Sequence, residues 1–423
     1  MFTNHRDTLG GAEHSSRISP AVLHAQAREL RKGNEEQKAP KTWFLRRFST
    51  KRGRASKGAG GGAQMPAAFR LKACILTFLL CAVSAIASAE ASAVKLEWAE
   101  KAFGDGRHNA FTDLTFWHGA FYLCFRNGTS HGSMDGLIKI MRSADARTWE
   151  PCGELDTLGD DRDPHFAATE DALHVFFGVW DLKHGEDHAT PDRSSIRSHV
   201  ASSKDGLAWS SIQGIYEPGW WLWRVIQHQG AFYAAAYTAY RPKPAQRELR
   251  LLSSPDGLEW NLVSTIAKDR MPTESDLWFD GQGTLNAVTR MADETNEACW
   301  FKSDASLKEW RPQFLGDIIH SPAVAQWHDR IFIAGRGKSD RGWVTRVWGL
   351  SSDRAVSLLT LPSTDDTAYP GLIVDPATAA DALQPALLVS WYSQHEPKNE
   401  PMPSKNAANV YVGRIVFPDA TAK

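Results

Sequence analysis

Cysteine is scarce in this chain, with five residues among 423. Two of them, Cys74 and Cys81, lie in an apolar segment near the N-terminus, which leaves Cys124, Cys152 and Cys299 for the rest of the chain. An odd number of cysteines allows at most one disulfide, and no CxxC pair or Cys/His cluster has zinc-ligand spacing. We therefore expect a large apolar core, rather than disulfides or structural zinc, to stabilise the fold.

Motifs of nucleotide and metal chemistry are also missing. No glycine-rich phosphate loop follows a predicted strand, because the glycine cluster at 58–62 lies in the N-terminal part of the chain. The histidines lack the spacing of metal ligands. We therefore predict neither a cofactor nor a metal ion.

The chain has no apolar run that comfortably spans a membrane. The run 73–87 follows two basic residues and ends in Ala87-Ser88-Ala89, which has the small-x-small form of a signal-peptide cleavage site. We interpret 65–89 as a signal peptide, so that the mature protein begins near Glu90, is secreted or periplasmic, and is not stably inserted in a membrane. Residues 1–64 are then a disordered or wrongly included basic extension, or an extended cytoplasmic region.

Basic and acidic residues balance overall but are unevenly placed. Residues 1–64 hold 13 Lys or Arg and 5 Asp or Glu, whereas from residue 90 onward 33 Lys or Arg stand against 44 Asp or Glu, a net charge of −11. Sixteen of the 17 tryptophans also follow residue 90. This composition excludes disorder and a basic nucleic-acid surface for 90–423, which we expect to be one domain.

A short apolar run of β-type residues recurs six times at intervals of 46 to 59 residues: 121–125, 173–177, 232–236, 285–289, 331–335 and 387–391. Units of about 50 residues with four short strands and no helical periodicity predict an all-β fold, a six-bladed β-propeller with four-stranded antiparallel blades. We expect the last segment, 409–416, to be an edge strand that helps to close the ring.

A second signal follows most of these runs. It combines an Asp-containing turn with a tryptophan and occurs at 142–149, 202–209 and 253–260, with a looser copy at 302–310. The Asp side chain can accept hydrogen bonds from turn amides while the tryptophan packs on the neighbouring sheet. We interpret these aspartates as turn formers and not as catalytic groups.

The segments before the six runs are expected to form the innermost strands, whose ends meet at the propeller axis. At matched positions they carry Asp113, Asp163, Arg224, Glu274, Ser321, and Tyr369 or Pro370. A second ring, at the ends of the runs, includes Arg126, Arg290, Arg336 and Tyr392. Arginines directly after buried strands need carboxylate partners or an anionic ligand, so we expect an anion or sugar site.

Over residues 95–417 these features resemble the sialidase (neuraminidase) superfamily, whose propellers carry turns of this kind, called Asp-boxes or BNR repeats. The family order is reproduced by Glu274, by Arg290 sixteen residues later, by Arg336 in the next blade and by Tyr369. In the first blade, Arg126 is followed by a loop with His131 and Asp135, where the family places its acid.

The resemblance implies an exported glycoside hydrolase that removes a terminal sugar, with sialic acid as the best candidate and a monomer as the expected state. Tyr369 would be the nucleophile, Glu274 would accept its proton, and Asp135, with His131 as neighbour or substitute, would protonate the leaving oxygen. The expected substrate ligands are Arg107, Arg126, His131, Arg162, Arg224, Arg290, Arg336 and His395.

Departures from the family pattern leave other assignments open. The Phe-Arg-Ile-Pro tetrapeptide of the first blade is missing, and Asp113 in place of its arginine would favour a neutral or differently charged sugar. Tyr392 competes with Tyr369 for the role of nucleophile. His395 is either a sugar ligand or a loop histidine.

Two further functions stay open. Asp113, Asp163 and Glu274 would serve a carboxylate-based glycosidase acting on a neutral sugar, because crowded carboxylates raise at least one pKa. Alternatively, the tryptophans at 220–223 would stack on sugars in a carbohydrate-binding propeller without catalysis.

Overall fold

The computed structural model describes residues 94–180, 196–239, 247–396 and 406–417. The expected extension (1–64) and signal peptide (65–89) lie outside these residues. The chain divides into two units, 1–69 and 70–423, and every described residue belongs to the second. Within the described ranges there is no helix of the length and apolarity needed to span a membrane.

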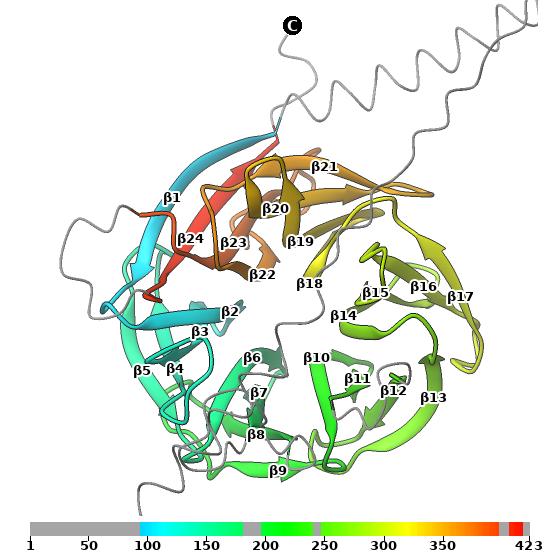
Figure 1. Cartoon of the computed structure of the whole chain (residues 1–423), viewed down its shortest axis with the longest axis horizontal. Helices are drawn as coiled ribbons and strands as arrows, with labels where there is room; N and C mark the ends of the chain where they lie inside the picture. Colours follow the sequence, from blue (N-terminus) through cyan, green and yellow to red (C-terminus); the bar gives the residue numbers. More distant parts are fainter. Residues whose placement is uncertain (1–93, 181–195, 240–246, 397–405, 418–423) are drawn as a thin grey trace, which may run out of the picture. The chain divides into compact units, whose positions relative to one another are not determined.

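The described residues contain twenty-four strands, which form six four-stranded antiparallel sheets, the blades of a β-propeller (Figure 1). This confirms the predicted fold. From the axis outward, the first three blades are β2 (His108–Trp117), β3 (Ala120–Gly128), β4 (Leu137–Ser143) and β5 (Glu150–Leu155); β6 (Asp160–Ala168), β7 (Leu173–Trp180), β8 (Arg197–Ser203) and β9 (Gln213–Ile215); and β10 (Trp220–His228), β11 (Ala231–Thr238), β12 (Leu249–Ser254) and β13 (Asn261–Ala267).

The next two blades follow the same order, and the sixth is completed by the N-terminal strand. They are β14 (Pro272–Phe279), β15 (Leu285–Met291), β16 (Cys299–Ser303) and β17 (Trp310–Phe314); β18 (His320–Trp327), β19 (Arg330–Ser339), β20 (Gly342–Leu350) and β21 (Ala355–Thr360); and β22 (Thr367–Val374), β23 (Ala386–Ser393), β24 (Asn409–Val416) and β1 (Lys95–Phe103).

The ring is closed by β1, which pairs with β24 from Lys95–Val416 to Phe103–Val410. The expectation that 409–416 form an edge strand is therefore wrong. Strand β24 lies between β23 and β1, and most of its residues are buried. The edge is β1, whose largely exposed side chains suit a strand at the rim.

The apolar core lies in layers between neighbouring blades. Every residue of β3 and of β23 is buried, because each second strand is covered on both faces. Cys124 and Ile138 of the first blade, for example, share a cluster with Val175 and Phe177 of the second. This double burial explains why the recurring runs are continuously apolar instead of alternating. The cysteines at 124, 152 and 299 are free thiols, so these three contribute no disulfide.

The turns between the third and fourth strands are shaped by aspartates. The Oδ1 atoms of Asp145, Asp205 and Asp256 each accept hydrogen bonds from the backbone amides two and three residues further on, at 2.8 to 3.0 Å. In the looser copy, Asp304 accepts from the amides of Lys308 and Glu309. These carboxylates form turns, and none of them lies on an innermost strand.

A β-bulge interrupts every innermost strand at the same level. In each case two residues oppose one residue of the next strand. The six pairs are Phe111-Thr112, Asp163-Pro164, Trp223-Arg224, Thr273-Glu274, Ser321-Pro322 and Tyr369-Pro370. In four pairs the first residue has a φ between 45° and 60°, which is strained for any residue other than glycine and persists only where its surroundings enforce it.

Arg224 connects the innermost strands at the axis. Its Nη1 donates to Asp113 Oδ1 at 2.7 Å, its Nε donates to Pro322 O at 3.2 Å, and its Nη2 donates to the carbonyl of Pro370. Asp113 in turn accepts from the backbone amide of Phe166. Asp276 lies 3.6 Å from Arg224 and accepts a hydrogen bond from the backbone amide of Val324 in β18. The network therefore reaches all six innermost strands.

We expect Arg224→Met to lower the free energy of unfolding by about 3–5 kcal/mol, because it leaves Asp113 buried without its counter-charge. Urea unfolding followed by tryptophan fluorescence measures the change. The matched control is Arg354→Met, since the Arg354–Asp353 pair is exposed and its loss is expected to leave the unfolding midpoint unchanged. Equal midpoints for the two variants would contradict the role given to Arg224.

Candidate active site

Residues of five blades surround one cavity of about 240 Å³. Six of the residues singled out from the sequence line it: His131, Arg162, Asp163, Glu274, Arg290 and Tyr369. Trp180, Trp221, Tyr237 and Arg247 also line it, and of these only Trp221 was considered as a sugar contact from the sequence. The bulges of β6, β14 and β22 supply Asp163, Glu274 and Tyr369, so the cavity depends on the shared interruption of the innermost strands.

Tyr369 and Glu274 form a hydrogen-bonded pair in this cavity. The Oη of Tyr369 donates to Glu274 Oε1 at 3.1 Å, and Arg290 Nη1 donates to both oxygens of the same carboxylate at 2.8 and 3.0 Å. Burial alone would raise the pKa of Glu274, but Arg290 and other nearby positive charges lower it. Burial and the Glu274 carboxylate raise the pKa of Tyr369. An ionised carboxylate thus faces a neutral phenol whose proton it can accept.

The position of Tyr369 is fixed through its backbone and its ring. Its carbonyl accepts a hydrogen bond from Thr112 Oγ1 at 2.9 Å, and the next carbonyl accepts from Arg224. Its ring packs at 4.8 Å from Phe111 and 5.7 Å from Trp223. These contacts from β2 and β10 hold a residue with a φ of 45°, so the first and third blades both determine where the phenol points.

Arg162 and Asp163 form another wall of the cavity. The guanidinium of Arg162 lies 4.7 Å from the ring of Phe111 and 4.1 Å from that of Trp180, and it donates to Asp160 at 3.3 Å. Burial raises the pKa of Asp163 to about 7; Arg162 opposes this shift and the charge of Glu274 adds to it. Asp163 is therefore partly protonated near neutral pH and can donate a hydrogen bond or a proton.

Polar atoms in the cavity wall lack partners in the part of the chain that is described. Asp163 Oδ1, Trp221 Nε1 and Arg290 Nε are buried and make no hydrogen bond there. Such atoms carry a free-energy cost that a polar ligand can reduce. The wall thus favours a ligand rich in hydroxyl or carboxylate groups.

Asp135 and Arg107 do not line the cavity. They form an exposed ion pair at 2.6 Å, and Asp135 also accepts hydrogen bonds from the amide and the hydroxyl of Thr129. Burial would raise the pKa of Asp135, but hydrogen bonds from Ser133 and Thr129 lower it to about 2. Asp135 therefore stabilises the loop between β3 and β4 as an ionised group, a state opposite to the one a proton donor needs.

Arg126 is fully buried and also outside the cavity. It pairs with the fully buried Asp160 at 2.6 Å, and its Nη1 and Nη2 donate to Ser130 O at 2.8 Å and Ser133 Oγ at 3.1 Å. The arginine expected to bind substrate instead anchors the loop that carries His131.

Asp113, Arg224 and His395 are likewise absent from the cavity wall. Asp113 and Arg224 neutralise each other at the axis, so Asp113 adds no uncompensated negative charge to the site. His395 packs 4.5 Å from the ring of Tyr411 and lines a separate hollow beside Ser339.

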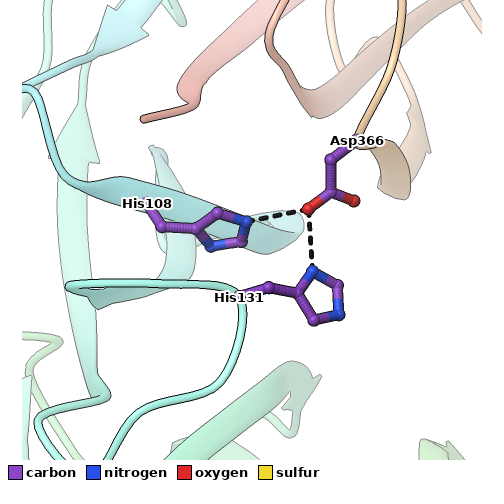
Figure 2. A group of neighbouring side chains, drawn as sticks. All are labelled: His108, His131 and Asp366. Carbon is purple, nitrogen blue, oxygen red and sulfur yellow. Dashed lines mark hydrogen bonds and ion pairs between the residues drawn. The ribbon is translucent and has the colours of Figure 1, made fainter. Parts of the chain in front are cut away.

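Tyr392 and Arg336 meet at Asp366, a residue that the sequence did not single out. Tyr392 Oη donates to Asp366 Oδ1 at 2.6 Å, and Arg336 Nη1 lies 3.8 Å from the same oxygen. The other oxygen, Oδ2, lies 2.8 Å from His108 Nε2 and 2.7 Å from His131 Nδ1 (Figure 2). Tyr369, and not Tyr392, is therefore the tyrosine beside Glu274.

The group formed by His108, His131 and Asp366 has the ligand types of a metal site, with its ligand atoms within 4.8 Å of one another. However, both imidazoles approach the same carboxylate oxygen at hydrogen-bond distance, and Arg336 lies on the other side of the carboxylate. Hydrogen bonds from the two imidazoles to Asp366 therefore account for the arrangement of the three side chains.

Asp366 was missed because it directly precedes β22, outside the segments matched between repeats. Tyr237 directly follows the run 232–236 and was not chosen as a site residue; burial raises its pKa well above the ordinary value, so its phenol stays neutral. Arg247 lies just before β12, where no repeat position drew attention to it. For Asp366, the signal available in the sequence was its place in the acidic pair Asp365-Asp366, immediately before a predicted innermost strand.

No protein-family model matches the chain, and no curated protein matches it. Solved structures do. A protein of unknown function from Dyadobacter fermentans DSM 18053 has a TM-score of 0.63 at 17% identity, covering 77% of this chain and 100% of that one. The sialidase of Trypanosoma rangeli has a TM-score of 0.52 at 11% identity, covering 74% and 55%. The endosialidase of phage phi92 has a TM-score of 0.51 at 11% identity, covering 77% and 70%.

These likenesses place the chain among six-bladed propellers with a sialidase-like fold. The chain spans about half the length of the T. rangeli sialidase. At such low identity the agreement concerns the fold alone.

The raised pKa of Asp163 predicts a pH-dependent contribution to stability. Because the folded state holds this proton up to about pH 7 whereas the unfolded carboxyl loses it near pH 4, stability falls as the pH rises between these values. Asp163→Asn cannot titrate, so its stability relative to the wild type should rise by about 2–4 kcal/mol between pH 4 and pH 8. Urea unfolding at both pH values measures this, with the exposed Asp269→Asn as control. A difference between variant and wild type that is the same at both pH values would contradict the shift.

Proposed function

We propose that this protein is an exported, sialidase-like glycoside hydrolase that removes a terminal anionic sugar, with sialic acid as the first candidate. The observation that carries the proposal is the hydrogen bond from Tyr369 to Glu274 in a cavity that also contains Arg162, Arg247 and Arg290. The T. rangeli sialidase was solved as a covalent intermediate with 2,3-difluorosialic acid, which supports the comparison. The Asp-containing turns, read as an Asp-box repeat, support it as well.

The charges of the cavity suit an anionic sugar. Three arginines line it against two carboxyl groups, and one of these, Asp163, is partly protonated near neutral pH. Arg290 pairs with Glu274 and Arg162 pairs with Asp160, and a substrate carboxylate in the cavity would meet the charges of all three arginines. This local excess of positive charge lies in a domain of net negative charge, which favours short-range recognition over long-range attraction of a polyanion.

The pair then acts as nucleophile and base. A carboxylate nucleophile would be repelled by a substrate whose own carboxylate adjoins the anomeric carbon, whereas the neutral phenol of Tyr369 is not. Glu274, ionised because Arg290 stabilises its charge, accepts the phenol proton as the bond to the anomeric carbon forms. Preorganisation of the pair by the bulges of β14 and β22 spares the enzyme the cost of assembling it.

A carboxylate-based glycosidase is the second candidate, and one observation favours it. Asp163 and Glu274 line the same cavity with opposite protonation preferences, since the pKa of Asp163 is raised by burial and that of Glu274 is lowered by Arg290 despite its burial. A protonated and an ionised carboxyl group are the two partners that hydrolysis of a neutral glycoside requires.

The test combines turnover with covalent trapping. The chain from Glu90 is assayed against aryl glycosides that include a sialoside, a hexuronide and neutral sugars, and it is incubated with 2,3-difluorosialic acid before intact-mass measurement and peptide mapping. We expect turnover of the sialoside and a label on Tyr369. Tyr369→Phe should abolish the label, and Glu274→Gln should lower kcat by about 10²–10⁴-fold because the base is lost.

Tyr233→Phe is the matched control, because Tyr233 packs against Phe279 away from the cavity and should leave turnover unchanged. Turnover of a neutral glycoside that survives Tyr369→Phe and fails in Asp163→Asn would favour the carboxylate candidate. Saturable glycan binding without turnover of any substrate would instead identify a carbohydrate-binding propeller.

A further inference from the structure

Among the residues that line the cavity, His131 is the one with an exposed side chain, and its imidazole is bonded to Asp366. Its side chain is 54% exposed, whereas Asp163, the other proton donor of the cavity, is buried. Its ring contacts Phe111 edge-on at 5.3 Å, and Phe111 in turn packs on Tyr369. In hydrolysis of a terminal sugar the leaving group extends toward solvent, so an exposed donor in the cavity wall is the one that can reach the leaving oxygen.

The hydrogen bond to Asp366 determines which nitrogen of His131 is available. Nδ1 donates to Asp366 Oδ2 at 2.7 Å, and Nε2 points away from Asp366 (Figure 2). Although burial opposes ionisation, hydrogen bonds from His108 and His131 lower the pKa of Asp366, so this carboxylate keeps its charge. A histidine oriented by a carboxylate through one nitrogen presents the other as an acid or base.

The other partners of Asp366 are arranged to keep it in place. His108 is fully buried, and burial lowers its pKa although Asp366 opposes this, so it is a neutral donor through Nε2. This tautomer agrees with His108 Nδ1, which has no hydrogen-bond partner among the described residues. Tyr392 supplies a further donor at 2.6 Å. His131 is therefore the imidazole of this group that is free to exchange a proton.

The loop that carries His131 is built as a fixed element. The buried pair Arg126–Asp160 holds Ser130 and Ser133 on either side of the histidine. Asp135 binds the start of the loop through the amide of Thr129 at 3.1 Å. The residues expected from the sequence to bind substrate or donate a proton thus position the loop instead.

We propose that His131, oriented by Asp366, is the general acid and base of this site, an inference that rests on the proposed function. In the first step the proton on Nε2 passes to the glycosidic oxygen as its bond to the anomeric carbon breaks, while Tyr369 Oη bonds to that carbon and its proton passes to Glu274. In the second step the oxygen of a water molecule bonds to the anomeric carbon while Nε2 accepts a proton from that water, the bond from the carbon to Tyr369 Oη breaks, and Glu274 returns its proton to the phenol oxygen.

Charged and titratable groups surround His131 on several sides. Asp366 and His108 contact it, Arg336 and Tyr392 lie behind Asp366, and the cavity wall opposite carries Arg162, Asp163, Arg247, Glu274, Arg290 and Tyr369. Of these, Asp366 is the carboxylate in direct hydrogen-bond contact with the imidazole.

The experiment compares leaving groups. The glycoside that the wild type turns over best is prepared with a 4-nitrophenyl group, which departs as a stable anion, and with an alkyl group, which needs a proton. His131→Gln keeps a donor toward Asp366 but cannot carry the proton, so kcat/KM for the alkyl glycoside should fall by about 10²–10⁴-fold and that for the 4-nitrophenyl glycoside by less than about tenfold. Asp366→Asn should likewise lower kcat/KM for the alkyl glycoside by more than that for the 4-nitrophenyl glycoside, because His131 loses the carboxylate that orients it.

The matched control is His118→Gln, in the turn between β2 and β3, which should leave kcat/KM for both glycosides unchanged. Thermal melting of all variants checks that they fold as the wild type does. Equal losses of His131→Gln on both substrates, or wild-type activity that EDTA removes and Zn²⁺ restores, would overturn the assignment of His131 while leaving the proposed function intact. A wild type that turns over no glycoside overturns both.

Discussion

The contacts of Arg224 are the interaction on which the rest of the site depends. A propeller has no continuous core across its axis, so the innermost strands need another means of holding their relative positions. Arg224 supplies it by bonding Asp113 of β2 and the carbonyls of Pro322 and Pro370, while Asp113 extends the network to β6 and the contact with Asp276 extends it to β14. One of the carbonyls that accept hydrogen bonds from Arg224 is that of Pro370, the residue next to Tyr369. The axis and the candidate nucleophile are therefore held by the same side chain.

The β-bulge that all six innermost strands share is what allows a polar cavity to form beside this network. A regular strand would direct alternate side chains into the inter-blade layers, where an ionisable group has no place. By placing two residues opposite one, each bulge releases a side chain from that alternation at a common level. Proline follows the first bulged residue in three of the six pairs, which is tolerated because the ladder hydrogen bond is already interrupted there.

The architecture and part of the site were accessible from the sequence because they repeat. Apolar runs at intervals of about 50 residues predict the blades, and matching positions before the runs brings Glu274 and Tyr369 together although 95 residues separate them. What does not repeat could not be predicted. The β3–β4 loop belongs to one blade, so nothing in the pattern distinguishes His131 from Asp135. The burial of Arg126 depends on Asp160, a partner whose side-chain direction no periodicity specifies.

The cavity also shows how one fold gives two carboxyl groups opposite states. Glu274 and Asp163 are both buried, and burial favours the neutral form of each. Arg290 bonds both oxygens of Glu274, which reverses the effect of burial there. Arg162, whose distance to Asp163 is 3.9 Å, divides its interactions between that residue and Asp160, so Asp163 keeps its proton to a higher pH. The pKa values of the two carboxyl groups differ because Arg290 bonds Glu274 directly, whereas Arg162 also pairs with Asp160. As a result, the ionised carboxylate is the one beside Tyr369, where a base is needed.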